Sequence, residues 1–218
     1  MLVLGIDPGS SRTGYGCIAR EGSRLRLLDA GVLAPKRGAA LADRLDHLHG
    51  RLTEVIQLWS PDLVAMETVF HGVNTRSLVV LGQARGALMA AVGGGPCDLC
   101  ELSPAEVKKA VTGRGGATKD QVAHMVGLLL GPASRGGRSR RATSASVQDG
   151  ATAQDGSRAA GSGDAPAGAG RDLEAGQPEA ILASTDLAKL SRDATDALAV
   201  AIAALHRAPG RSPGGARG

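Results

Sequence analysis

The chain opens with Leu2-Val3-Leu4-Gly5-Ile6-Asp7-Pro8-Gly9, a short apolar run that ends at an acid and a turn signal. The run predicts a buried strand, and Pro8-Gly9 predicts the turn that follows it. Two more apolar stretches, Tyr15–Ala19 and Leu25–Leu33, flank a polar tetrapeptide and predict a hairpin. The first part of the chain is therefore expected to form three consecutive strands.

Helix and strand patterns alternate after the hairpin. Short apolar runs predict two further strands, Leu63–Met66 and Cys97–Leu102. Helical spacing and capping boxes predict five helices: Leu41–Ile56, Leu78–Val92, one that begins at Pro104, one from Lys119 to about Leu130, and Asp193–His206. Because Leu78–Val92 is apolar around much of its circumference, we expect that helix to be well buried.

The composition changes abruptly between about residues 131 and 179, where Gly, Ala, Ser, Asp and Arg replace almost all large apolar side chains. Such a segment cannot bury enough surface to offset the entropy lost on ordering. We therefore expect a single domain over residues 1–208, interrupted by a low-complexity, disordered insertion at 132–182, and a flexible tail at 209–218. The basic cluster at 135–141 could tether phosphate, but an inert spacer is the simpler interpretation.

The overall composition limits the kinds of partner. The 218 residues carry a net charge of +4, and only 1% are aromatic, with one Phe, one Trp and one Tyr. A surface built from rows of stacking aromatics is excluded, so any recognition of nucleic acid must use charge and shape. The start does not resemble a signal peptide, no apolar run approaches the roughly 18 residues of a membrane span, and three cysteines do not fit a disulfide framework. We expect a cytoplasmic protein without membrane contact.

Four acids occupy positions that could bring them together. Asp7 ends the first strand and Glu67 ends the fourth, and such strand ends meet at one edge of an α/β sheet. Asp193 and Asp196 lie three residues apart in the first turn of the last helix, so both project from nearly the same face. Taken singly, Asp7 could be a turn residue and Asp193 a helix-start acid, and spacing alone leaves the grouping open.

Such a cluster would be suited to metal ions. Four carboxylates would repel one another and raise one another's pKa values, and hard divalent cations relieve that repulsion. Ligands made only of oxygen suit Mg²⁺ or Mn²⁺. Paired ions can activate water and stabilise the leaving oxygen of a phosphodiester. The four acids therefore indicate a candidate two-metal phosphodiesterase site.

Several motifs together resemble one family, the RuvC crossover junction endodeoxyribonucleases, which are Holliday junction resolvases. They occur in the family's order: Leu4–Gly9 with Thr13–Gly16, Met66–Phe70, Leu81–Gly86, Val107–Lys108 with Thr112–Gly113, Lys119–Val122, and Asp193–Ala201. The resemblance covers about residues 1–131 and 185–207. It departs from the family pattern only in the roughly 50 additional residues before the last acidic pair.

The resemblance implies an α/β, RNase H-like fold: a five-stranded mixed sheet, its first three strands antiparallel, flanked by helices on both faces. It also implies a homodimer that binds four-way junction DNA and nicks two strands symmetrically during recombination and repair, together with the RuvA–RuvB branch-migration complex. Carried over residue by residue, the catalytic and metal-binding positions are Asp7, Glu67, Asp193 and Asp196. Two Mg²⁺ ions per site are expected, with Mn²⁺ able to substitute.

Six residues are candidates for DNA contact: Phe70, Arg76, Lys108, Lys109, Arg114 and Lys119. Lys108 and Lys119 match family lysines, whereas a merely solvated face is an equal alternative for Lys109 and Arg114. The family has an aromatic at the position of Phe70 that is thought to stack on or wedge into bases at the crossover; a core position is the alternative. Arg85 is a further candidate that could instead serve a structural ion pair.

Three other functions compete with this interpretation. A phosphotransferase of the actin and sugar-kinase superfamily shares the fold and an Asp-x-Gly loop, but the chain is too short for its two domains. The YqgF-type resolvase-like nucleases act on RNA, and their chains are usually shorter and lack the Lys108–Lys119 pattern. A non-catalytic junction-binding protein would have no use for four acids. Cys97 and Cys100 have zinc-like spacing, but within a strand they would point to opposite faces.

Overall fold

The computed structural model describes residues 1–68, 75–131 and 189–208. Its five strands are β1 (Leu2–Asp7), β2 (Thr13–Glu21), β3 (Arg24–Leu33), β4 (Leu63–Glu67) and β5 (Asp98–Leu102). They form one sheet in the order β3-β2-β1-β4-β5. β1, β2 and β3 pair antiparallel, whereas β4 pairs parallel with both β1 and β5. The predicted mixed sheet with three antiparallel first strands is confirmed.

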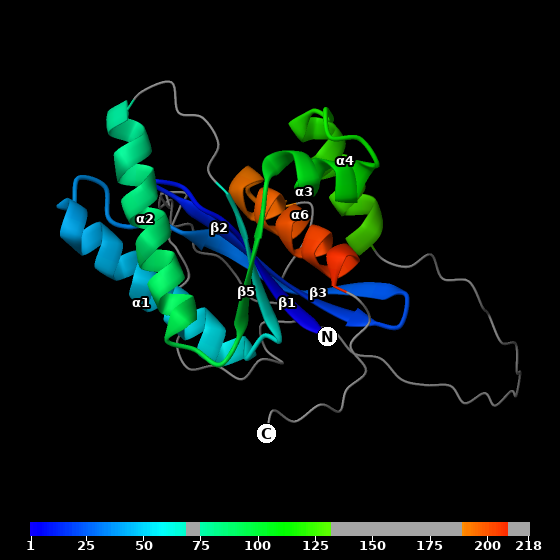
Figure 1. Cartoon of the computed structure of the whole chain (residues 1–218), viewed down its shortest axis with the longest axis horizontal. Coiled ribbons are helices and arrows are strands. Elements are labelled where there is room, and N and C mark those ends of the chain that lie inside the picture. Colours follow the sequence, from blue (N-terminus) through cyan, green and yellow to red (C-terminus); the bar gives the residue numbers. More distant parts are fainter. Residues whose placement is uncertain (69–74, 132–188, 209–218) are drawn as a thin grey trace, which may run out of the picture. The chain divides into compact units, whose positions relative to one another are not determined.

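Helices cover both faces of this sheet (Figure 1). They are α1 (Leu41–Trp59), α2 (Thr75–Gly93), α3 (Pro104–Thr112), α4 (Lys119–Leu130) and α6 (Arg192–Arg207). One hydrophobic core joins the sheet to α1 and α2, and another joins it to α3, α4 and α6. In β1, Val3 belongs to the second core, whereas Leu4 and Ile6 belong to the first. A strand buried on both faces explains why the opening of the chain is apolar without alternation.

Two local predictions are confirmed in detail. α3 and α4 both begin with capping boxes, at Ser103 and Thr118. The Ser103 amide donates to Glu106 Oε2 at 2.7 Å, and the Glu106 amide donates to Ser103 Oγ at 3.3 Å. β2 is longer than predicted, since Thr13 and Gly14 also pair with β3 although neither carries an apolar signal.

α2 does not have the burial that its composition predicts. Ala84, Leu88, Ala91 and Val92 are buried, but Leu78 is 39% exposed and Val79 is 56% exposed. The start of α2 extends past the strands in the view of Figure 1, and the buried residues of α2 all lie in its later turns. The prediction of a well-buried helix is therefore wrong for the first half of α2.

None of the helices in the described parts of the chain combines the length and apolar character needed to cross a membrane.

α6 lies directly against β1 and β2 because glycines remove the side chains that would separate them. A Cβ at Gly5 would collide with the carbonyl oxygen of Ala197, and a Cβ at Gly14 would collide with the carbonyl oxygen of Asp193. The helix meets these glycines with a buried face that consists largely of alanines. The first turn of α6 is thereby fixed beside the end of β1, which is where Asp7 lies.

Candidate active site

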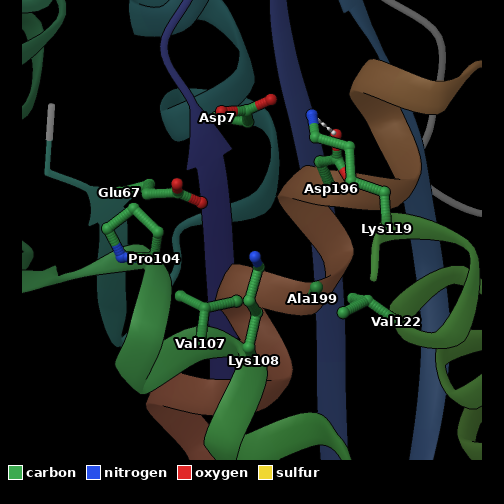
Figure 2. Close-up of a pocket in the computed structure, with 9 residues that line it drawn as sticks. All are labelled: Asp7, Glu67, Pro104, Val107, Lys108, Lys119, Val122, Asp196 and Ala199. Atoms are coloured by element: carbon green, nitrogen blue, oxygen red, sulfur yellow. Dashed lines mark hydrogen bonds and ion pairs between the residues drawn. The ribbon is translucent and has the colours of Figure 1, made fainter. Parts of the chain in front are cut away.

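Three of the four predicted carboxylates converge at one edge of the sheet. Asp7 ends β1 and Glu67 ends β4, and these strands run parallel as neighbours. Asp196 reaches the same place from the start of α6. The three acids line a pocket of about 70 Å³ whose other lining residues are Pro104, Val107, Lys108, Lys119, Val122 and Ala199 (Figure 2). The grouping that spacing alone left open is therefore present in the fold for Asp7, Glu67 and Asp196.

The acids in this pocket repel one another. The pKa of Asp7 is raised to about 7, mainly by burial and then by the charges of Glu67 and Asp196. The pKa of Glu67 is also raised, again by burial first and then by Asp196. Burial in a medium of low dielectric penalises the charged carboxylate, and neighbouring negative charges add to that cost. The site therefore favours the arrival of positive charge.

Two lysines supply part of that charge. Lys119, the first residue of α4, places Nζ 3.1 Å from Asp196 Oδ2, and this contact raises the pKa of Lys119. Lys108, on α3, directs its ammonium into the pocket in Figure 2, and its charge offsets part of the rise in the pKa of Glu67. Their positions follow from the capping boxes, which fix where α3 and α4 begin. Two of the predicted DNA-binding residues thus line the same pocket as the acids.

Asp193 differs from the other three acids. It does not line the pocket; instead, its Oδ2 accepts a hydrogen bond from Arg12 Nε at 2.8 Å. Residues three apart are separated by about 60° around a helix, which turns Asp193 toward the β1–β2 loop while Asp196 faces the pocket. Arg12 was not singled out in the sequence, because its partner lies 181 positions away. Nothing local marks such a contact.

The donor set suits a hard cation, although two of the acids are already paired. Carboxylate oxygens are the ligands that Mg²⁺ prefers in proteins. Within residues 1–68, 75–131 and 189–208, however, no three carboxylate, histidine or cysteine side chains are arranged to hold a metal ion. Lys119 engages Asp196 and Arg12 engages Asp193. The four carboxylates suit a metal ion in their chemistry and charge. In this structure Arg12 and Lys119 are paired with the two acids of α6.

The other predicted DNA-binding residues lie apart from the acids. Lys109 lines a separate cavity of about 360 Å³ between α3 and α6. Arg114 is exposed in the turn between α3 and α4, and Arg76 is exposed in the first turn of α2. Phe70 lies outside the described residues. Arg85 forms an ion pair with Glu101 on β5, which confirms the structural alternative.

Cys100 lies in β5 and Cys97 directly precedes that strand, and the two do not form a metal site. Cys97 packs against the core beneath α1 and α2, whereas Cys100 packs against the core on the other face of the sheet. Both are free thiols. The prediction that they point to opposite faces is confirmed.

Comparison with known proteins identifies the family of the chain. The family profile described as crossover junction endodeoxyribonuclease RuvC matches residues 3–136. The chain is 48% identical over 131 residues to the RuvC of Anaeromyxobacter sp. (strain Fw109-5), covering 60% of this chain and 64% of that one. It is 47% identical over 131 residues to the RuvC of Chlorobaculum parvum, covering 60% and 70%. The chain thus spans less than two thirds of the first of these relatives.

Solved structures extend the likeness along the chain. Thermus thermophilus RuvC matches with a TM-score of 0.63 at 25% identity, covering 94% of both chains. The same protein in complex with a Holliday junction substrate matches with a TM-score of 0.62 at 23% identity, again covering 94% of both chains. These matches confirm the RNase H-like α/β class. The profile match contains Asp7 and Glu67 and ends before α6, so the position of Asp196 rests on the fold itself. The chain belongs to the RuvC family of crossover junction endodeoxyribonucleases.

Proposed function

We propose that this chain is a structure-selective endonuclease that resolves four-way DNA junctions by hydrolysing phosphodiester bonds. The observation that carries the proposal is the meeting of Asp7, Glu67 and Asp196 with two lysines in one pocket at the edge of the sheet. Acids that raise one another's pKa values are costly to keep together, and a site that receives cations and phosphates gives them a use. The family assignment supports the same chemistry.

Nucleases of the RuvC family depend on divalent metal ions generally. We propose Mg²⁺, with two ions per site and Mn²⁺ able to substitute, held by Asp7, Glu67, Asp193 and Asp196. When bound, such ions supply an activated water and stabilise the charge on the leaving oxygen. The bound ions would then neutralise the acids in place of Lys119 and Lys108. The ammonium groups of the two lysines would thereby become available to the phosphate.

Residues around the pocket would hold the DNA backbone. Lys108 and Lys119 lie at the pocket itself, so we propose that they contact the phosphates nearest the cleaved bond. Arg76, Lys109 and Arg114 are exposed and would contact phosphates farther away. Phe70 follows Glu67 by three residues, and we propose that it stacks on or wedges between bases at the crossover.

The proposed partners follow from the symmetry of the substrate. A four-way junction has two equivalent strands to cut, and a twofold homodimer presents two equivalent sites. The exposed Leu78 and Val79 of α2 support such an interface, because neighbouring apolar side chains on a surface favour association. We also propose that the dimer works with the RuvA–RuvB branch-migration complex, in the cytoplasm, where cellular DNA is recombined and repaired.

We further propose that residues 1–208 make up one nuclease domain, with residues 132–182 as an insertion and 209–218 as a tail. The described parts on either side of the insertion support this division, since α3, α4 and α6 share one hydrophobic core. The cost of closing a loop grows only slowly with its length, so a long insertion is compatible with the fold.

The proposal is tested by offering the purified protein matched substrates with Mg²⁺. A synthetic four-way DNA junction, a linear duplex with the sequence of one arm and an RNA of the same sequence would be compared. We expect paired nicks in the junction only. Cleavage of the RNA would favour a YqgF-type nuclease, and junction binding without cleavage would favour a non-catalytic binding protein.

A further inference from the structure

Arg12 and Asp193 form an ion pair that ties the β1–β2 loop to the start of α6. Arg12 Nε lies 2.8 Å from Asp193 Oδ2, and the two side chains are 56% and 38% exposed. The pair joins two segments that flank the acid pocket, since Arg12 follows Asp7 by five residues and Asp193 precedes Asp196 by three. It belongs to neither hydrophobic core.

The loop that carries Arg12 is held in place by its own hydrogen bonds. Thr13 is fully buried, and its Oγ1 donates to the Gly9 carbonyl at 3.3 Å and accepts from the Gly9 amide at 3.4 Å. The next residue, Gly14, packs against the Asp193 carbonyl. Arg12 therefore projects toward Asp193 from a backbone that is fixed to both β1 and α6.

This contact removes one oxygen of Asp193 from other uses. Asp196, one turn along α6, lines the pocket with Asp7 and Glu67, whereas Asp193 does not. Asp193 is nevertheless near enough to raise the pKa of Asp7, as the smallest of the causes that act on it. The carboxylate thus lies beside the pocket and is engaged elsewhere.

We propose that Arg12 is a positioning residue that holds Asp193 aside from the other three carboxylates and competes with a divalent cation for it. This inference rests on the proposed function, in which Asp193 is a metal ligand. An oxygen that accepts a hydrogen bond from a guanidinium cannot at the same time offer the same lone pair to a metal. A divalent ion attracts the carboxylate more strongly than a single positive charge does, so the ion displaces Arg12 once its concentration is high enough.

The strength of the competition follows from the exposure of the pair. Ion pairs exposed to solvent are weak, because water screens them and both side chains lose freedom. Removing Arg12 should therefore tighten cation binding by about two- to five-fold, not by orders of magnitude. Arg12→Lys, which keeps the charge, should stay closer to the wild type.

The experiment measures Mn²⁺ binding by calorimetry on the full-length protein without DNA. We expect Arg12→Gln to bind Mn²⁺ about two- to five-fold more tightly than the wild type. Arg26→Gln is the matched control, because Arg26 Nε pairs with Glu21 Oε1 at 3.1 Å with similar exposure, 51% and 62%, on the β2–β3 hairpin. The control changes the net charge equally and should leave the affinity unchanged.

A second pair of variants separates the ion pair from a general effect of charge. In an Asp193→Asn background, Arg12→Gln should no longer change Mn²⁺ affinity, since the coupling of two residues in contact vanishes when either is removed. An equal effect of Arg12→Gln with and without Asp193 would overturn the proposal. So would unchanged affinity in Arg12→Gln alone.

A direct readout on the wild type guards against a misfolded variant. The Nε–H signal of Arg12 in a ¹H–¹⁵N spectrum should move as Mg²⁺ is added, because the ion releases the side chain from Asp193. A stationary signal at saturating Mg²⁺ would also overturn the proposal. These results leave the proposed function standing if the wild type still cleaves junctions; absence of both cation binding and cleavage in the wild type would instead reject the proposed function.

Discussion

Asp7 is the residue on which the electrostatics of the site depend most. Its pKa of about 7 means that, without metal, the folded protein binds a proton there that the unfolded chain releases near pH 4. Between these values the folded state binds more protons than the unfolded state, so the free energy of unfolding falls as the pH rises. Without a bound cation, the ionised form of Asp7 therefore destabilises the folded protein.

Replacing Asp7 by asparagine should stabilise the metal-free protein at pH 8 by about 1–3 kcal/mol, because the amide carries no charge to bury. At pH 4, where Asp7 is protonated in the folded state, the difference should largely disappear. Urea unfolding in the presence of chelator at both pH values measures this. Equal stability of the two proteins at pH 8 would show that ionised Asp7 does not destabilise the folded state.

Asp29 is a buried acid with a different role. It is 4% exposed and accepts hydrogen bonds from Tyr15 Oη at 3.1 Å and Trp59 Nε1 at 3.3 Å. One oxygen of Asp29 thus accepts from both Tyr15 and Trp59, two of the three aromatic residues of the chain. They lie on the face of the sheet opposite the acid pocket. Local sequence patterns do not mark Asp29, since its partners lie 14 and 30 positions away.

Asp29→Ala should lower the free energy of unfolding by about 2–4 kcal/mol, because it removes the acceptor of two buried donors and leaves a cavity. Asp29→Asn keeps one oxygen acceptor and should cost less. Chemical denaturation would rank the two variants. A loss below about 1 kcal/mol for the alanine variant would show that the donors find other partners.

At the scale of elements, the contact between α6 and the β1–β2 hairpin places the acidic pair. Gly5→Ala and Gly14→Ala would each push the helix away from the sheet, because the new methyl group meets backbone atoms that cannot yield. We expect each substitution to lower the free energy of unfolding by about 2–4 kcal/mol. Each should also reduce cleavage more than junction binding. Gly127→Ala on α4 is the matched control, since nothing lies within 4 Å of its added Cβ.

The control should be neutral or slightly stabilising, by up to about 1 kcal/mol, since alanine favours the helix over glycine. Thermal unfolding with Mg²⁺-dependent cleavage on the same preparations tests both expectations. If Gly14→Ala kept full stability and activity, close packing would not be what positions Asp193 and Asp196.

The predictability of each element follows from the range of the interactions that shape it. β1 and the starts of α3 and α4 depend on neighbours in the sequence, namely an apolar run and two capping boxes, and these predictions are confirmed. The burial of α2 depends on which layer covers it, which composition cannot show, and there the prediction is wrong. Strand ends and family motifs predict the meeting of Asp7, Glu67 and Asp196 only as a hypothesis, because it depends on how α6 docks on the sheet. The contact of Asp193 with Arg12 depends on the rotation of α6 about its axis, which no local pattern indicates.

At the scale of the whole molecule, the proposed dimer is tested through the exposed start of α2. Leu78→Glu with Val79→Glu should convert the dimer to a monomer, because burying two new charges in an interface costs more than a modest interface can offset. Leu128→Glu is the matched control: Leu128 is 64% exposed on α4. Light scattering after gel filtration reports the mass. A dimer that survives the double substitution would place the interface elsewhere.

The acid pocket is proposed to cut junction DNA with a divalent metal. A supercoiled plasmid with an extruded cruciform tests this when it is incubated with the wild type or Asp7→Asn in Mg²⁺ or in chelator. Paired nicks within one binding event give linear DNA, whereas single nicks give open circles. We predict linear product only with the wild type and Mg²⁺, while Asp7→Asn still binds the junction. Linear product from Asp7→Asn, or from the wild type in chelator, would contradict the account.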